Sequence, residues 1–233
     1  HTHTVVFLHG RGDNARKFAS SLPYSRDSRD RSLMDAFPSF RWVFPQAPIR
    51  STVTQWFDVW NVHNLKERED VSTPGLRESV AAIRRLLARE AAQLDGRWDR
   101  VVLAGISMGC ATSVHTLFHL DDVPRLGAFL GFSGRCPFAG RPTLAEMRGV
   151  LAPVEGASVG GGDDGEEGAV QFLRKTPMLL EHCANDPLVL VQYGRQLRDT
   201  LRGFGAQVEW KEYPDGGHWF HSPTGTDDVV SFL

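Results

Sequence analysis

Short apolar segments alternate along this chain with longer segments of helical periodicity, and this alternation strongly limits the folds open to it. The apolar segments are rich in β-branched and aromatic residues and end near turn-forming residues, so they predict strands. The predicted strands cover residues 4–8, 41–44, 100–104, 126–132, 177–180 and 207–213. All except the last lack polar alternation, as expected of strands covered on both faces. The last one alternates, which indicates a half-exposed strand near a sheet edge.

Helices are predicted between and after these strands. The clearest has an apolar stripe at steps of three and four, through Leu76, Val80, Ile83, Leu87, Ala91 and Leu94. Thr73 is its predicted cap and Pro74 its first residue. Further helices are predicted from Ser107 to before Pro124, from about 189 to 201, and from about 226. Strands that alternate with helices predict an α/β fold with a mostly parallel central sheet and helices on both faces.

The length of 233 residues suits one domain, and we expect a single domain over residues 1–233. One region departs from the regular pattern. Residues 136–175 show no clear periodicity, and glycine and acidic residues dominate residues 155–168. Such a composition buries little apolar surface, so it predicts a flexible surface insertion at 155–168.

Charge and cysteine content argue against several classes of function. The formal net charge is −2, so no basic excess is available for binding nucleic acid. The longest apolar run, near residues 101–106, is far shorter than the roughly 18 residues that span a membrane. Cys110, Cys136 and Cys183 are too few and too widely spaced for a disulfide framework or a zinc site. They favour a reducing, cytoplasmic location, although one Cys136–Cys183 bridge is compatible with the sequence.

The strongest functional signal is the pentapeptide Gly105-Ile-Ser107-Met-Gly109, which stands between a predicted strand and a predicted helix. This is the G-x-S-x-G nucleophile elbow in the context that the motif requires. The serine must occupy a strained turn that lifts its hydroxyl above the sheet edge. A Cβ atom two residues before or after it would collide with the neighbouring elements. Ser107 is therefore the predicted nucleophile, and a chance match to the motif is the alternative.

A serine hydroxyl needs a positioned base, and in this topology an acid and then a histidine follow the serine along the chain. Asp186 lies just after the strand predicted at 177–180, at the sheet edge where parallel α/β folds place functional groups. His218 follows two glycines in the loop after the last strand, and histidine carries protons near neutral pH. A helix cap is the alternative role for Asp186, and His221 is the rival base.

A tetrahedral oxyanion also needs hydrogen-bond donors. The backbone N–H of Met108, the residue after the nucleophile, is one predicted donor. The other is the backbone N–H of Arg11 in the loop His9-Gly-Arg-Gly-Asp13, where the glycines let the backbone turn inward. A glycine turn without a catalytic role is the alternative interpretation of this loop.

Together these segments resemble the acyl-protein thioesterase branch of the phospholipase/carboxylesterase family of α/β-hydrolases, along nearly the whole chain. The resemblance rests on residues 5–13, 56–58, 105–109, 186–189 and 217–218. It implies the α/β-hydrolase fold without a large cap domain. It also implies hydrolysis of carboxylic esters, or of thioesters on lipidated cysteines, without a metal or cofactor. Family members usually have Leu, Gln and Gly at the positions of Arg11, Met108 and Cys110, so the pocket wall of this chain differs from theirs.

The resemblance further implies that Trp56, Phe57 and Trp60 line an acyl pocket, whereas the sequence alone favours simple core aromatics. The expected partner is a small-molecule or lipid-acyl ester or thioester, including an acylated protein, and the expected assembly is a monomer or homodimer. The remaining histidines show no spacing that indicates a metal site. Two other functions stay open: a secreted esterase that acts on extracellular esters, and a non-catalytic ligand-binding protein of the same fold.

Overall fold

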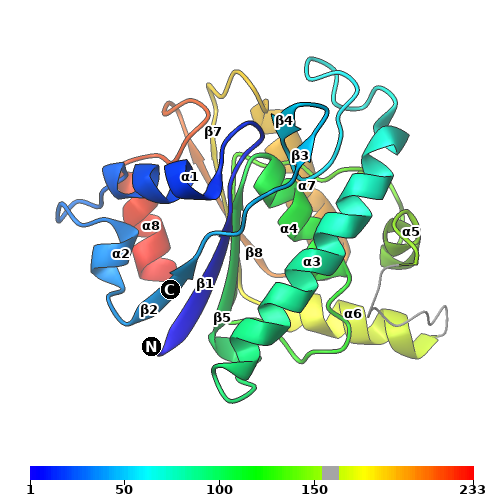
Figure 1. The fold of residues 1–233 in the computed structure, drawn as a ribbon, viewed down its shortest axis with the longest axis horizontal. Coiled ribbons are helices and arrows are strands. Elements are labelled where there is room, and N and C mark those ends of the chain that lie inside the picture. Colours follow the sequence, from blue (N-terminus) through cyan, green and yellow to red (C-terminus); the bar gives the residue numbers. More distant parts are fainter. Residues whose placement is uncertain (154–162) are drawn as a thin grey trace.

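A parallel sheet forms the centre of the computed structural model, which describes residues 1–153 and 163–233 (Figure 1). The strand order is β2-β1-β5-β6-β7-β8, and every neighbouring pair runs parallel. The six strands are β1 (His3–Leu8), β2 (Phe40–Val43), β5 (Val101–Ile106), β6 (Ala128–Phe132), β7 (Met178–Cys183) and β8 (Val208–Tyr213). The predicted strands and their parallel arrangement are confirmed, with small shifts at the strand ends.

Helices cover both faces of this sheet (Figure 1). One face carries α1 (Ala15–Ser21), α2 (Leu33–Ala36) and α8 (Thr224–Phe232). The opposite face carries α3 (Thr73–Ala92), α4 (Met108–Phe118), α5 (Leu144–Gly149), α6 (Asp163–Lys175) and α7 (Val191–Gly203). Short 3₁₀ turns lie at Leu22–Tyr24, Glu69–Ser72 and Trp98–Arg100. Outside the main sheet, β3 (Ile49–Arg50) pairs antiparallel with β4 (Val53–Thr54).

The sheet divides the apolar core into two clusters, one under each layer of helices. Consecutive residues of β1 show how this happens. Val6 and Leu8 belong to the cluster under α3 and α4, whereas Val5 and Phe7 belong to the cluster under α1 and α8. All are fully buried, which explains the unbroken apolar character of the central strands. The last strand, β8, lies at the sheet edge and exposes part of its length, as its alternating sequence predicts.

The structure differs from the sequence expectations between residues 136 and 175. Two helices form there: α5, which Thr143 caps, and α6, which buries Ala169, Phe172 and Leu173. Residues 163–168 of the flexible insertion expected at 155–168 instead belong to α6, and residues 155–162 lie outside the described residues.

The start of α3 also differs from the prediction. Ser72 precedes the helix without a side-chain capping hydrogen bond, and Thr73 is the first helical residue. Thr73 is therefore not the cap, because the 3₁₀ turn at Glu69–Ser72 runs directly into α3 and leaves no extended residue before it.

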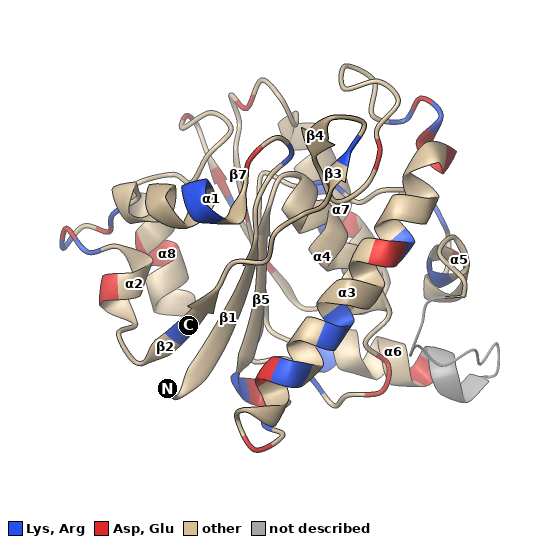
Figure 2. Cartoon of the chain, viewed as in Figure 1, with Lys and Arg blue, Asp and Glu red and all other residues tan. Residues whose placement is uncertain are grey.

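Surface charge and thiols agree with the composition. Residues of both signs are interspersed along α3 (Figure 2). The three cysteines are buried free thiols, so the Cys136–Cys183 bridge does not form. Among the described residues, no helix combines the length and apolar character needed to cross a membrane.

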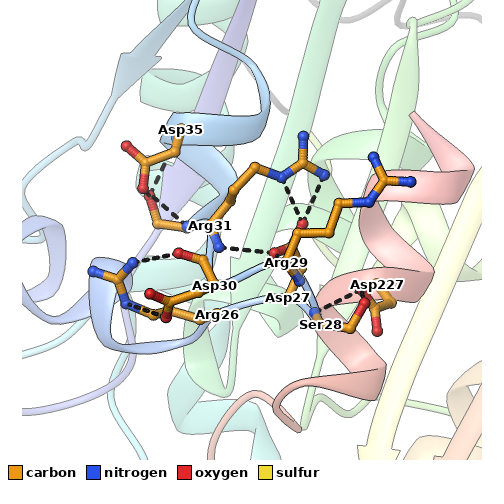
Figure 3. A network of polar contacts seen from close by, with 9 residues as sticks. Arg26, Asp27, Ser28, Arg29, Asp30, Arg31, Asp35 and Asp227 are labelled. Carbon is orange, nitrogen blue, oxygen red and sulfur yellow. Dashed lines mark hydrogen bonds and ion pairs between the residues drawn. The ribbon is translucent and has the colours of Figure 1, made fainter.

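A polar network joins the loop before α2 to α8 (Figure 3). The Asp27 carboxylate accepts hydrogen bonds from Arg31 Nε and Nη2 at 2.9 and 2.7 Å. The backbone N–H and the hydroxyl of Ser28 both donate to Asp227 Oδ1 at 2.9 Å. The network therefore anchors the start of α8 to the loop before α2.

Glu181 of β7 is a buried carboxyl whose ionisation links stability to pH. Burial, reinforced by the nearby Asp228 carboxylate, raises the pKa of Glu181 well above its usual 4.5. Tyr213 and Lys211 of β8 also lie beside it and oppose this shift, and Glu209 adds to it. The folded protein thus holds this proton more tightly than the unfolded chain does. This contribution to stability is complete below pH 4.5 and is lost as the pH rises toward the raised pKa.

Replacing Glu181 with Gln is therefore expected to increase the free energy of unfolding by about 1–3 kcal/mol at about pH 8, with little change near about pH 4. Chemical denaturation across a pH series measures this difference. Glu146→Gln on the exposed side of α5 is the matched control and should show no such pH dependence. The explanation fails if both variants follow the same pH curve.

Candidate active site

Ser107 lies at the turn between β5 and α4, at the carboxyl end of a central strand. Its backbone has φ 57° and ψ −123°, a conformation that costs free energy for a residue with a Cβ atom. The Ser107 N–H donates to the Phe132 carbonyl of β6 at 2.9 Å, and the Ser107 carbonyl accepts from the Ala111 N–H at 3.1 Å. Backbone hydrogen bonds on both sides thus hold the strained turn that the pentapeptide predicts.

Close backbone contacts explain the two glycines of the pentapeptide. A Cβ atom on Gly105 would lie 2.6 Å from the carbonyl carbon and oxygen of Gly109. A Cβ atom on Gly109 would lie 2.6 Å from the carbonyl oxygen of His9, at the end of β1. Because backbone atoms cannot rotate aside as a flexible side chain can, only glycine fits at either position. This packing brings the amino end of α4 and the loop after β1 together around Ser107.

Asp186 and His218 meet from two separate loops. Asp186 follows β7, and its Oδ2 atom accepts a hydrogen bond from His218 Nδ1 at 2.7 Å. Its Oδ1 atom accepts from the backbone N–H groups of Leu188 and Val189 at 2.9 and 3.0 Å. Burial alone would raise the pKa of Asp186, but the adjacent His182 and His218 side chains and the Val189 N–H outweigh burial and hold that pKa well below its usual value. The carboxylate is therefore ionised, and it caps its own loop rather than α7, which begins later.

The structure separates His218 from its rival His221. The two glycines before His218 have φ values of 116° and 67°, which let the loop turn back over the sheet. His221 Nε2 instead lies 3.3 Å from Asp215 Oδ1, and its ring stacks on Tyr213 with the centroids 4.4 Å apart. Of the two histidines, His218 is the one that reaches the ionised Asp186.

A cavity of about 590 Å³ opens beside the strained turn, and both Ser107 and His218 line it. Its apolar lining includes Phe57, Val59, Leu65, Ile106 and Val189. Leu188 also lines the cavity and is 64% exposed, so the apolar lining continues to the surface. Such a lining beside a few polar groups favours a ligand with a hydrocarbon part.

Of the three aromatic residues expected in this pocket, the structure places only Phe57 along the cavity. The buried Trp56 side chain donates its indole N–H to the His9 carbonyl at 2.9 Å and so supports the loop after β1. Trp60 is 56% exposed and packs under Arg68, whose guanidinium carbon lies 4.2 Å from the ring centroid. Trp56 and Trp60 thus lie away from this cavity, because the Trp56 indole is directed to the His9 carbonyl and Trp60 lies at the surface under Arg68.

Arg11 and Met108, whose backbone N–H groups are the predicted oxyanion donors, both line the cavity. Met108 is the first residue of α4, where backbone N–H groups have no partner within the helix. The Arg11 side chain is held by its Nε bond to Gln55 Oε1 at 2.7 Å. The next N–H, of Gly12, donates to the Thr54 carbonyl at 2.7 Å. These contacts fix the loop that holds Arg11 at the cavity wall, next to Met108 on α4.

His9 supports the same loop and is missed by the sequence motifs. Its Nδ1 atom bonds to the Gly10 carbonyl at 2.7 Å, and its Nε2 atom accepts from the Ala47 N–H at 3.2 Å. Burial lowers the pKa of His9, so the imidazole is neutral and can make both bonds. In the sequence, His9 is visible only as a histidine between a predicted strand and a glycine turn. This pattern is too common to show that the histidine supports the loop.

The cysteines near the motifs are buried thiols. Burial raises the pKa of Cys110 to about 12 and that of Cys183 to about 11, so both thiols stay protonated near neutral pH. In the part of the chain that the structure describes, no group of three or more His, Cys, Asp or Glu side chains is arranged to hold a metal ion.

Known proteins provide independent evidence for the family. The family model described as phospholipase/carboxylesterase matches residues 1–147. Acyl-protein thioesterase 1 of Gibberella zeae is 30% identical, and the alignment covers 100% of this chain and 90% of that protein. Acyl-protein thioesterase 1 of Schizosaccharomyces pombe is 31% identical over 81% of this chain and 70% of its own length. The crystal structure of Zea mays acyl-protein thioesterase 2 matches with a TM-score of 0.72 and 26% identity, covering 100% and 93% of the two chains.

These similarities agree with the architecture and the motifs. The helix-covered parallel sheet is the one found in the esterases and thioesterases of similar structure. The strained turn at Ser107, after β5, lies within the residues that the family model matches. The chain therefore belongs to the phospholipase/carboxylesterase family and is a hydrolytic enzyme with the α/β-hydrolase fold.

Proposed function

We propose that this chain is a serine hydrolase that cleaves carboxylic esters or thioesters through an acyl-enzyme on Ser107. One observation carries the proposal: Ser107, His218 and the predicted donors Arg11 and Met108 all line one cavity. Asp186 supports His218 through the 2.7 Å hydrogen bond to Nδ1. Acyl transfer requires this combination of nucleophile, base, orienting acid and oxyanion donors.

The first half of the reaction forms the acyl-enzyme. Because His218 Nδ1–H donates to Asp186, the Nε2 atom is free to accept the Ser107 hydroxyl proton as Oγ attacks the acyl carbonyl carbon. The carbonyl oxygen becomes an oxyanion and receives hydrogen bonds from the backbone N–H groups of Arg11 and Met108. The bond to the alcohol or thiol then breaks, and the leaving group takes the proton from His218 Nε2.

The second half releases the acid. A water molecule gives a proton to His218 Nε2 and attacks the carbonyl carbon of the ester on Ser107. The second tetrahedral intermediate collapses, the carboxylic acid leaves, and the proton returns to Ser107 Oγ. Asp186 stays ionised throughout, as its lowered pKa requires, and stabilises the imidazolium in both halves.

The cavity and the relatives support acyl substrates. An apolar cavity of about 590 Å³ is large enough for a hydrocarbon chain next to the nucleophile. Relatives named acyl-protein thioesterase align over the whole chain, which supports an acylated protein as one substrate alongside small-molecule esters. The buried free thiols support a reducing location such as the cytoplasm.

A panel of p-nitrophenyl esters and acyl thioesters of graded chain length tests this function. We expect turnover of both classes. The value of kcat/KM should rise with chain length until the cavity is filled, because each buried methylene contributes about 0.8 kcal/mol. Labelling with a fluorophosphonate reports a reactive serine independently of the substrate chosen. Absence of turnover on the whole panel, together with absence of labelling, would contradict the proposal.

A further inference from the structure

His182 is a second histidine at the Asp186 carboxylate, and the acyl transfer does not use it. It lies on β7 and is 2% exposed. Its Nε2 atom lies 2.7 Å from the Val189 carbonyl oxygen and 3.4 Å from Asp186 Oδ2. The same Oδ2 atom accepts the hydrogen bond from His218 Nδ1 at 2.7 Å. Two imidazoles therefore meet at one carboxylate oxygen.

The surroundings of His182 determine which of its nitrogen atoms carries the proton. A carbonyl oxygen only accepts hydrogen bonds, so Nε2 must be the donor to Val189. The Nδ1 atom is buried and has no hydrogen-bond partner among the described residues, so a proton there would be left unsatisfied. The Nε2 atom of His182 therefore carries a proton, which makes the side chain a donor toward the Asp186 loop.

Neighbouring elements confine the His182 ring. A Cβ atom on Gly194 of α7 would overlap His182 Nδ1, and it would lie 3.0 Å from Cε1 of the same ring. The same Cβ atom would lie 2.9 Å from Cη2 of Trp210 on β8, whose ring centroid is 6.2 Å from that of His182. Glycine at position 194 thus leaves the space that the imidazole fills. The ring has no room to turn away from the acid loop.

From this geometry we infer that His182 is a positioning residue for Asp186. The Val189 N–H donates to Asp186 Oδ1 at 3.0 Å, and the Val189 carbonyl oxygen accepts a hydrogen bond from His182 Nε2. His182 therefore holds the 186–189 loop in place around the carboxylate. The nearby Nε2–H also restricts rotation of the carboxylate and keeps Oδ2 directed at His218. This role rests on the proposed function, because it concerns how the acid orients the base of that reaction.

Two substitutions of His182 separate positioning from packing. His182→Leu fills much of the space but removes the donor, whereas His182→Gln keeps a side-chain N–H near the position of Nε2. We expect kcat of His182→Leu to fall about 10- to 100-fold, with KM changed less than about twofold, because a misplaced base slows chemistry more than binding. His182→Gln should recover most of this loss. Equal losses in the two variants, at equal thermal stability, would overturn the inference.

A measurement without substrate distinguishes failure of this inference from failure of the proposed function. The proton between His218 Nδ1 and Asp186 Oδ2 should give a far-downfield proton NMR resonance in the parent protein. It should broaden by exchange in His182→Leu and stay sharp in His182→Gln. If the resonance broadens in His182→Leu and stays sharp in His182→Gln, but the parent protein hydrolyses nothing on the panel, the positioning role holds and the proposed function fails. If it is equally sharp in all three proteins, the positioning role fails whatever the activity.

Discussion

Ser107→Ala is expected to lower kcat by about a million-fold, because Ser107 Oγ is the atom that forms the acyl-enzyme in the proposed reaction. The fold should persist, since the backbone of Ser107, and not its hydroxyl, makes the hydrogen bonds to Phe132 and Ala111. The predicted oxyanion donors, Arg11 and Met108, remain in place and account for whatever slow turnover is left. Hydrolysis of a p-nitrophenyl ester and labelling by a fluorophosphonate should both disappear.

Ser113→Ala is the matched control for this experiment. Ser113 lies on the same helix, α4, is fully buried, and donates its hydroxyl to the Gly109 carbonyl at 2.8 Å. Loss of that hydrogen bond should cost about 1 kcal/mol of stability and leave labelling intact. The assignment of the nucleophile is refuted if Ser107→Ala hydrolyses the ester at the parent rate.

Asp186→Asn is expected to lower kcat by about ten-thousand-fold, because it reverses the tautomer of His218, the proposed base. The backbone N–H groups of Leu188 and Val189 both donate to Oδ1, so the asparagine must keep its oxygen there. Its NH₂ group then occupies the Oδ2 position and donates to His218 Nδ1. The imidazole proton moves to Nε2, which can no longer accept the proton of the serine. Steady-state kinetics on the best ester of the panel measures the loss.

Asp215→Asn tests whether Asp215 and His221 form the acid–base pair instead. Asp215 lies 3.3 Å from His221, and its side chain is 76% exposed. If His218 and Asp186 form the working pair, this variant keeps kcat within about twofold of the parent value, as expected of a surface substitution. A large loss in Asp215→Asn with little loss in Asp186→Asn would assign the base to His221.

Much of the fold follows from the spacing of apolar residues. The central strands are apolar runs because helices cover both faces, as the opposite environments of Val5 and Val6 show. Several missed elements are too short for a period to appear: α1 has seven residues, α5 six and α2 four, and β3 and β4 have two each. Helix α6 is missed for another reason. Its sequence begins with glycine and acidic residues, and its buried apolar residues start only at Ala169.

The candidate site is predictable where glycine motifs mark strand ends, and less so elsewhere. Ser107, Asp186 and His218 each follow a strand at the same edge of the sheet, so the parallel order alone brings them near one another. The supporting residues depend instead on side-chain direction. His182 precedes Asp186 by four residues, yet no spacing rule shows that its Nε2 atom reaches the Val189 carbonyl. Packing against Arg68 similarly keeps Trp60 at the surface.

Because the turn at Ser107 is strained, the reactivity of this serine depends on the elements around it staying packed together. Three elements hold that turn: β6 through Phe132, α4 through Ala111, and the end of β1 through its close approach to Gly109. An intermediate that detaches any one of them lets the serine relax to an ordinary backbone conformation, and its hydroxyl then loses its place in the cavity that His218 also lines. During gradual denaturation, fluorophosphonate labelling should therefore vanish while circular dichroism still reports nearly full helix content.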